Sequence, residues 1–553
     1  MFGKDIKGYF SSSTSAENSS DASEVSIETG NPPPENRGVI TPEGQRSIGM
    51  VSAIFLILNR IIGTGIFATP ATIYSLAGSV GLSLILWAVG SLIALSGLMV
   101  YMEWGSQIPK NGGEKNYLEY FYRKPKFLAL CCYAAYAFLL GWAASNSVVF
   151  GEYILVAAGK EVTRWNQRGI GVACLTFSFL LHGTFKRAGL ALQNVLGLFK
   201  LVVIGMMIII GFVALGGGGG IKETGNFHDS FTNTADSTSG YGVVMALYNI
   251  IWSFVGYSNA NYALAEAKNP NRILKYAAPT ALISVAILYM LVNIAYFAVV
   301  PLDIMKSSGR IVAAEFFRVV WGEKGAKALS VFVALSALGN VLAVIYSQGR
   351  IVQELGREGV LPFSQLWATS RPFNTPFMGL FEHWGVSMII LLAPPPGDAY
   401  NFILNLISYP LSVVNAAVSF GLIVIYLTKD KHKYWPDWDP PLKATLPVAV
   451  FFFLASLYLV AAPFIPPDAG QNVYESLPYY LHCVVGLGLF GGGFIYWLIF
   501  FVAIPYFGGY RLESKCEIDS KGWPRNHITR VYDHEDDAST VGTKTEPVIS
   551  ELA

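Results

Sequence analysis

Two glycines on either side of a threonine interrupt the first long apolar segment of this chain. Gly63 and Gly65 flank Thr64 within the segment 51–68, which is long enough to cross a lipid bilayer. Glycine costs a helix about 1 kcal/mol relative to alanine, so two glycines here predict that the helix unwinds. Unwound backbone is tolerated at membrane depth only where it lines a cavity or water inside the protein. The interruption therefore predicts a binding site near the middle of a membrane.

The composition fits a chain that crosses a membrane many times. Of its 553 residues, 53% are hydrophobic and only 14% are charged, which is unlike a set of soluble domains. The formal net charge of +1 predicts no general affinity for nucleic acid. The five cysteines lack the paired spacing of a metal site and four lie in apolar segments, so we predict buried thiols and no bound metal.

Twelve segments are long and apolar enough to predict transmembrane helices. They are 50–76, 80–106, 127–157, 168–182, 189–215, 240–266, 276–300, 328–349, 377–393, 402–427, 445–464 and 480–506. We therefore predict an all-α polytopic membrane protein with twelve transmembrane helices.

The lysines and arginines of the loops predict the orientation. With the N-terminus in the cytoplasm, the inner loops hold 17 of these residues and the outer loops hold 9. Because cytoplasmic loops carry the excess of positive charge, we expect both termini to be cytoplasmic. The outer loop 301–327 carries five of the nine among acidic and apolar residues, so we expect an amphipathic surface helix there.

Two polar tails enclose the membrane-spanning part. We predict that 1–46 and 511–553 are disordered cytoplasmic tails, that 47–427 forms a core of ten spans, and that 428–510 adds spans 11 and 12. Lys4 and Lys7 are the only lysines before the first span, which makes them candidate ubiquitin acceptors. An unmodified, solubilising tail is the alternative.

A second interruption lies in the sixth span. Its centre, 254–261, combines Gly256 with Ser258, Asn259 and Asn261, and such polar side chains compete for backbone hydrogen bonds. Two interrupted helices in corresponding positions of two halves are typical of secondary transporters built from inverted repeats. The alternative is a pair of ordinary kinked helices whose small residues allow close packing.

The chain resembles the amino acid–polyamine–organocation superfamily over most of its apolar part. The segment Ile62–Phe67 resembles the glycine-rich motif of the first helix in that superfamily, and Glu266–Pro270 resembles the exit of the sixth. The segments 347–362 and Pro109–Gly113 resemble the end of the eighth helix and the loop after the second. Within the superfamily the chain is most similar to the L-type amino acid transporter branch, and Asn59–Pro70 resembles the fungal high-affinity methionine permeases.

The resemblance implies the leucine-transporter-like fold of five-plus-five inverted repeats with two further spans and discontinuous helices 1 and 6. Backbone groups at the two breaks would then bind an α-amino acid. The amides of Thr64 and Gly65, at the N-terminus of a half-helix, would hold the carboxylate. The carbonyls of Ile61, Trp252 and Val255 would accept hydrogen bonds from the ammonium group.

Side chains near the breaks would select the substrate. Trp252 matches the aromatic residue that closes over the substrate in the family, although a tryptophan at the membrane interface is the alternative. Ser253 lies beside it, and Ser258 stands where the family usually has asparagine. Leu411 in span 10 aligns with a further asparagine of the family and makes the wall more apolar. Such a pocket would suit a polarisable side chain such as that of methionine.

Lys200 lies near the middle of span 5, too deep to reach the membrane surface easily. An ionisable residue inside a membrane is a functional candidate by default. In the family, a lysine at this place takes the position of an ion in sodium-coupled relatives, so Lys200 is our candidate for proton coupling. The alternative is a permanently charged strut bonded to carbonyls of span 1.

Arg60 stands three residues before the first break and needs an acidic partner. Glu103 and Glu266 are the nearest acidic residues by their place in the spans. An ion pair that closes the inner gate and an ion pair that only stabilises the scaffold are the two alternatives. A third is that Glu103 caps the cytoplasmic end of span 2.

Together these features predict a transporter of the plasma membrane and not an enzyme or a channel. We expect a neutral L-amino acid, with methionine favoured, to be imported by proton symport with alternating access and without a cofactor. A facilitative exchanger of the same fold is the first alternative, and a nutrient sensor that does not transport is the second. Animal relatives bind a disulfide-linked single-span partner through a cysteine between spans 3 and 4. The loop 158–167 has no cysteine, so we expect no such partner.

Overall fold

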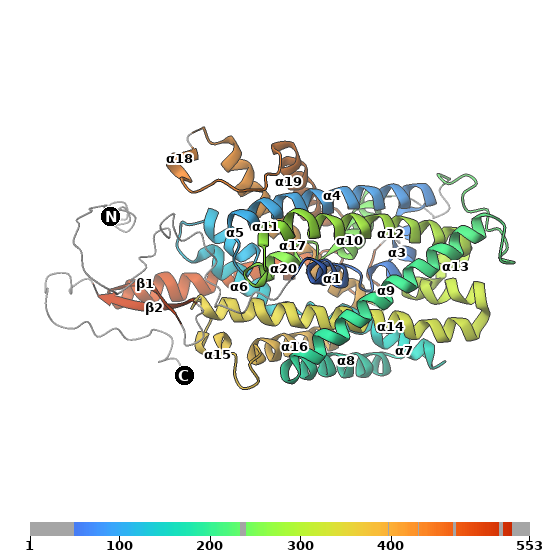
Figure 1. Cartoon of the computed structure of the whole chain (residues 1–553), viewed down its shortest axis with the longest axis horizontal. Coiled ribbons are helices and arrows are strands. Elements are labelled where there is room, and N and C mark those ends of the chain that lie inside the picture. Colours follow the sequence, from blue (N-terminus) through green and yellow to red (C-terminus); the bar gives the residue numbers. More distant parts are fainter. Residues whose placement is uncertain are drawn as a thin grey trace.

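The computed structural model describes residues 49–232, 239–395, 398–429, 431–467, 472–518 and 524–532. The predictions for Lys4, Lys7 and the tail 1–46 lie outside these residues. Long helices run side by side along the longest axis of the molecule, and a β-hairpin projects at one end (Figure 1).

The helices of the first part are α1 (Met50–Ile61), α2 (Gly65–Ala68), α3 (Pro70–Ala77), α4 (Val80–Gln107), α5 (Glu114–Phe121), α6 (Leu128–Leu139), α7 (Ala144–Ala157), α8 (Arg164–Thr184), α9 (Lys186–Leu215) and α10 (Gly240–Phe254). The middle part has η3 (Asn259–Glu266), α11 (Pro270–Arg272), η4 (Ile273–Ala277), α12 (Ala278–Val299), α13 (Leu302–Ser308), η5 (Gly309–Ile311), α14 (Val312–Arg357), α15 (Ser364–Ala368) and α16 (Phe377–Leu392). The last part has α17 (Ala399–Leu427), α18 (Lys431–Tyr434), α19 (Leu446–Ala461), η6 (Ala462–Phe464), α20 (Leu481–Trp497), η7 (Leu498–Ala503), α21 (Ile504–Gly508), β1 (Tyr510–Ile518) and β2 (Pro524–Tyr532).

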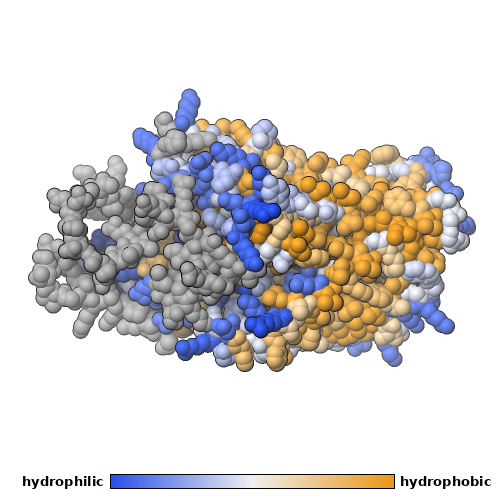
Figure 2. All heavy atoms as spheres, viewed as in Figure 1, coloured by the Kyte–Doolittle hydropathy of each residue, from blue (hydrophilic) through white to orange (hydrophobic). Residues whose placement is uncertain are grey.

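The prediction of a multi-pass, mainly helical membrane protein is confirmed. Within the described residues, nine helical stretches are long and apolar enough to cross a membrane. They are Met50–Ala68, Val80–Gln107, Leu128–Ala157, Lys186–Leu215, Pro270–Val299, Leu302–Arg357, Ala399–Leu427, Leu446–Phe464 and Leu481–Gly508. Figure 2 shows the matching surface, a broad apolar band with polar residues toward both ends of the molecule.

Helix α9 illustrates how the sequence separates a lipid face from a protein face. Four of its exposed apolar side chains, Val195, Leu198, Val202 and Ile209, recur three, four and seven residues apart. This spacing places them on one side of an α-helix. Lys200 lies on the opposite side and is 1% exposed, so the one charged residue deep in this helix faces protein and not lipid.

The two interrupted helices lie inside the bundle. Helix α1 packs against α9, α12 and α14, while α10 packs against α3, α4 and α17. Every residue from 61 to 70 is buried. The unwound backbone is therefore enclosed by protein, which is the condition for breaking a helix at membrane depth.

The C-terminal tail is ordered where we predicted disorder. Strands β1 and β2 pair antiparallel, with Tyr510 opposite Tyr532. Tyr510 and Ile528 are only 6% and 5% exposed, so the hairpin buries apolar side chains although most residues of this segment are polar. The prediction of a disordered 511–553 is therefore wrong for the two strands, while 519–523 and 533–553 lie outside the described residues.

A polar contact fixes the hairpin to the end of α14. The side-chain amide of Asn526 donates a hydrogen bond of 2.6 Å to Glu358, whose other oxygen pairs with Lys115 of α5. Burial lowers the pKa of Lys115, but the Glu358 carboxylate and its acidic neighbours raise it by more, so the ammonium stays charged. The hairpin is thus bonded to Glu358, directly after α14, and through Glu358 to Lys115 of α5, the helix that follows α4.

Replacing Gly359 with alanine is expected to release the hairpin. Gly359 has φ +77°, and a Cβ there would lie 2.8 Å from the main-chain oxygen of Asn526. The backbone strain alone costs about 1–2 kcal/mol, which corresponds to a roughly tenfold faster cleavage of 510–532 in limited proteolysis. Gly220→Ala is the control, because Gly220 has φ +68° and no neighbour within 4 Å. Equal protection of both variants would contradict the expected result.

Candidate functional site

The first break is held open by an asparagine from another span. Helix α1 ends at Ile61 and α2 begins at Gly65. Between them, the Thr64 amide and hydroxyl both donate to Oδ1 of Asn146 on α7, at 3.3 and 2.7 Å. The Thr64 amide, which we predicted to bind a carboxylate, is therefore already bonded. In the described part of the chain, the amides of Gly63, Gly65 and Ile66 have no acceptor, and those of Gly65 and Ile66 are the donors available at the start of α2.

The glycines of this break allow neighbouring helices to approach closely. A Cβ on Gly63 would lie 2.5 Å from Nδ2 of Asn340 on α14. A Cβ on Gly65 would lie 2.5 Å from Oγ and 2.8 Å from Cα of Ser253 on α10. Both distances are shorter than real Cβ contacts. The two glycines therefore bring the first break into direct contact with the spans that enclose it.

The predicted interruption of the sixth span is confirmed. Helix α10 ends at Phe254, and the chain continues as a 3₁₀-helix, η3, from Asn259. Between them, Gly256 has φ +122°, and a Cβ there would lie 2.5 Å from Cγ of Arg60. Because Arg60 belongs to the last turn of α1, the two breaks pack directly on each other.

The carbonyls predicted to bind an ammonium group differ in their bonding. The Ile61 carbonyl accepts a hydrogen bond of 3.0 Å from the Tyr289 hydroxyl, and the Trp252 carbonyl accepts one of 3.1 Å from the Val255 amide. The Val255 carbonyl has no donor within the described residues. Since each carbonyl oxygen can accept two hydrogen bonds, all three retain capacity for a ligand, and Val255 retains the most.

Three of the predicted selectivity residues are buried in or beside the second break. Trp252, Ser253 and Ser258 are 6%, 1% and 8% exposed. Ser253 donates to the Asn249 carbonyl at 2.8 Å and lies 3.3 Å from the Thr69 hydroxyl, so it also links α10 to the residue between α2 and α3. Leu411 on α17 is partly buried against the apolar core.

Tyr400 is a site residue that sequence reasoning missed. It lies near the start of α17 and is 1% exposed, with its hydroxyl beside Thr64 and Trp252. In the part of the chain that the structure describes, that hydroxyl makes no hydrogen bond of regular geometry, although Thr64 and Trp252 lie within its reach. We placed span 10 from residue 402, so Tyr400 fell outside it. A tyrosine directly before an apolar run was the available signal.

Lys200 binds the backbone that the first break releases. Its Nζ donates to the carbonyl of Ile62 at 2.6 Å and to that of Asn59 at 3.3 Å. These carbonyls lie at the C-terminal end of α1, where helix carbonyls lack partners and a cation is favourable. The side chain crosses Gly339 of α14, whose Cβ would lie 3.4 Å from Nζ. These are the bonds expected of a strut, and release of a proton from Lys200 stays a prediction.

Arg60 and Glu103 have different surroundings. Arg60 is 6% exposed, and its carbonyl accepts a hydrogen bond of 2.8 Å from Asn340. Glu103 accepts hydrogen bonds from the Tyr426 hydroxyl at 2.6 Å and from the Ala444 amide at 2.7 Å. It therefore fastens α4 to the end of α17 and to the loop before α19. The side chain of Glu266, our other candidate partner for Arg60, lies outside the described residues.

Glu103→Leu is expected to lower stability without changing the affinity for substrate. The substitution leaves the buried Ala444 amide without its acceptor, at about 1–3 kcal/mol for that unsatisfied group, while the Tyr426 hydroxyl keeps its hydrogen bond to the Ala444 carbonyl. Thermal unfolding of the purified protein, followed by tryptophan fluorescence, measures the loss. Glu103→Gln keeps an acceptor oxygen and is the control. A changed KM for uptake with unchanged unfolding would instead place Glu103 in the gate with Arg60.

A comparison with known families decides which family the chain belongs to. A family model described as amino acid permease matches residues 48–490, which is more than half of the chain. The chain belongs to the amino acid permease family. The predicted superfamily, and the prediction of a transport protein and not an enzyme, are thereby confirmed.

Two yeast proteins are among the relatives of this permease. It is 53% identical to the high-affinity methionine permease of Saccharomyces cerevisiae over 510 residues, which cover 92% of this chain and 88% of the relative. It is 32% identical to the low-affinity methionine permease of the same yeast, over 86% of each chain. The human b(0,+)-type amino acid transporter 1 is 28% identical over 78% of this chain and 85% of its own.

Proposed function

We propose that this permease imports L-methionine across the plasma membrane by proton symport, through alternating access. The observation that carries the proposal is the 53% identity to a high-affinity methionine permease over 92% of the chain. The 32% identity to a second protein named for methionine supports the same substrate.

The chemistry of the two breaks supports an α-amino acid as substrate. The unbonded amides of Gly65 and Ile66 supply donors for a carboxylate, and the carbonyl of Val255 supplies an acceptor for an ammonium group. Tyr400 adds a buried hydroxyl beside Thr64 of the first break. Trp252 provides an aromatic wall, against which a thioether makes a favourable contact. Ser258 and Leu411 complete the proposed selectivity residues.

The architecture that fits this function has twelve spans arranged as five-plus-five inverted repeats with two further spans. Three elements would join the nine long apolar stretches: α8, α10 with η3, and α16. The interrupted helices would then be spans 1 and 6, which occupy corresponding places in the two repeats. The loop charges support an orientation with both termini in the cytoplasm.

The proposal of proton coupling rests on Lys200, and the alternative is a Lys200 that stays charged throughout the transport cycle. A lysine enclosed by protein can gain and lose a proton as its surroundings change. Its two bonds to carbonyls at the end of α1 equally favour a fixed charge, and with it a facilitative exchanger of the same fold.

Uptake of radiolabelled L-methionine into proteoliposomes tests the proposal. An inwardly directed proton gradient is expected to drive accumulation above equilibrium, and a protonophore is expected to abolish it. Uptake that ignores the gradient but needs internal amino acid would support the exchanger. Binding of methionine without any flux would support the sensor. Transport of another amino acid alone would overturn the substrate and leave the family unchanged.

A further inference from the structure

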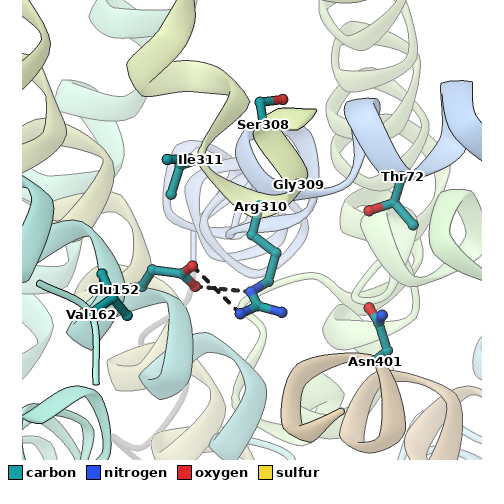
Figure 3. A pocket seen from close by; sticks show the side chains of 8 residues that line it. All are labelled: Thr72, Glu152, Val162, Ser308, Gly309, Arg310, Ile311 and Asn401. Atoms are coloured by element: carbon teal, nitrogen blue, oxygen red, sulfur yellow. Dashed lines mark hydrogen bonds and ion pairs between the residues drawn. The ribbon is translucent and has the colours of Figure 1, made fainter. Parts of the chain in front are cut away.

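A cavity lies at the opposite end of the molecule from the C-terminal hairpin (Figure 1). It has a volume of about 380 Å³, within the range of small-molecule sites. Its wall is formed by Thr72, Glu152, Val162, Ser308, Gly309, Arg310, Ile311 and Asn401 (Figure 3). These residues come from α3, α7, the loop after α7, the segment from α13 through η5, and α17, and of these elements α3 and η5 pack against α2.

The cavity wall carries one cation and one anion side by side. Arg310 donates from Nε to Oε2 of Glu152 at 2.9 Å and from Nη2 to Oε1 at 3.5 Å. Gln167 also donates to Oε2 of Glu152, at 3.2 Å. The side chains of Arg310 and Glu152 are 23% and 10% exposed, so both charges are largely withdrawn from water yet border the cavity.

The remaining donors lie on one side of this ion pair. In Figure 3, the third guanidinium nitrogen of Arg310 points away from Glu152, toward the side where Thr72 and Asn401 lie. The Asn401 amide donates one long hydrogen bond, of 3.4 Å, to the Val473 carbonyl and keeps a second N–H, so a hydroxyl, an amide N–H and a guanidinium nitrogen there match the acceptors of a carboxylate. Glu152 lies on the other side. Among the described residues its Oε1 accepts only one long hydrogen bond, so that oxygen can also accept from an ammonium group.

The cavity is linked to the first break through two tyrosines. The Arg310 guanidinium lies 5.8 Å from the ring centroid of Tyr400, whose hydroxyl lies beside Thr64 and Trp252. The hydroxyl of Tyr153 lies 2.9 Å from the Arg310 carbonyl and 3.1 Å from the Phe67 carbonyl of α2. Tyr400 therefore separates the cavity from the proposed central site, and Tyr153 ties the cavity wall to the half-helix that follows the break.

We propose that this cavity is a second binding site, which holds the charged head group of a neutral α-amino acid before the amino acid reaches the central site. The proposal rests on the proposed function as an amino acid transporter. The incoming carboxylate binds Arg310, Thr72 and Asn401, and the ammonium group binds Glu152. A zwitterion leaves the net charge of the cavity at zero. An amino acid with a charged side chain places an unpaired charge in a largely buried site and is disfavoured.

Equilibrium binding of radiolabelled L-methionine to the purified full chain in lipid nanodiscs tests the second site. The unmodified chain is expected to bind two equivalents. Arg310→Gln and Thr72→Trp are each expected to bind one and to raise the KM for uptake about tenfold, because each removes the outer site. Thr72→Trp fills the cavity and leaves the ion pair intact, so it guards against misfolding of Arg310→Gln. Lys324→Gln, an exposed cation that does not line the cavity, is the matched control and is expected to bind two.

The outcomes separate this site from the proposed function. If the unmodified chain transports methionine but binds one equivalent, as Arg310→Gln also does, the proposal of a second site is wrong and the proposed function still stands. The same conclusion follows if both cavity variants retain two equivalents. A chain that neither transports nor binds methionine overturns both proposals.

Discussion

Gly65→Ala is expected to lower methionine uptake by about 10- to 100-fold. The added Cβ would lie 2.5 Å from Oγ and 2.8 Å from both Cα and Cβ of Ser253. A hydroxyl can rotate away, but Cα belongs to the backbone of α10 and cannot. Forcing a methyl group into such a contact costs about 1–3 kcal/mol, and each 1.4 kcal/mol is a factor of ten. Uptake per copy at the cell surface is the measurement, with surface protein quantified in parallel.

Two further variants identify the cause of that loss. Gly205→Ala on α9 makes the same chemical change where nothing lies within 4 Å, so its uptake is expected to equal that of the unmodified chain. Adding Ser253→Gly to Gly65→Ala removes Oγ and Cβ of Ser253 but leaves Cα, so only part of the uptake returns. Normal uptake by Gly65→Ala itself would mean that the two spans do not pack this closely during transport.

Lys200→Ala is expected to abolish accumulation driven by a proton gradient. Nζ donates to the carbonyls of Ile62 and Asn59, and alanine leaves both oxygens buried without that donor. It also removes the only ionisable group deep in α9. Gradient-driven uptake and counterflow, in which external methionine exchanges with internal methionine, are measured in the same proteoliposomes.

Lys200→Arg separates the proton carrier from the strut. Arginine keeps a cation and its hydrogen bonds, but it does not lose its proton in proteins. If Lys200 carries the proton, this variant is expected to catalyse counterflow while losing accumulation against a gradient. If Lys200 is only a strut, gradient-driven uptake and counterflow rise or fall together. Full pH-dependent uptake by Lys200→Ala would contradict proton coupling through this residue.

The breaks themselves could be predicted from the sequence because their cause is local. Glycine at 63, 65 and 256 weakens a helix wherever it stands, and a break in lipid requires an enclosing cavity. The partners of the breaks could not be predicted in this way. Asn146 and Asn340 reach the breaks from spans 3 and 8 in our numbering, and Tyr400 from just before span 10, and only the packed helices bring them there. Each is a single polar or aromatic residue in or beside an apolar run, which gives no sign of its partner.

The C-terminal hairpin was missed for a different reason. Its strands are polar on average, and composition alone favours disorder for such a segment. Its stability comes from apolar residues such as Ile528 packing on the bundle and from the contact between Asn526 and Glu358. Both depend on a surface that other parts of the chain build. The tail is thus an example of tertiary contacts outweighing the local composition.

Most of the unbonded polar groups that the structure describes at the two breaks belong to the main chain, and this affects which substitutions can change the site. A point mutation to any residue except proline leaves the main-chain amide in place, and every substitution leaves the carbonyl, so the donors of Gly65 and Ile66 and the acceptor of Val255 are displaced more readily than deleted. Substitutions at Trp252 or Leu411 can therefore vary the substrate while recognition of the amino acid head group persists. Libraries restricted to such side chains should yield many active transporters with altered substrate range, whereas libraries at the glycines should yield almost none.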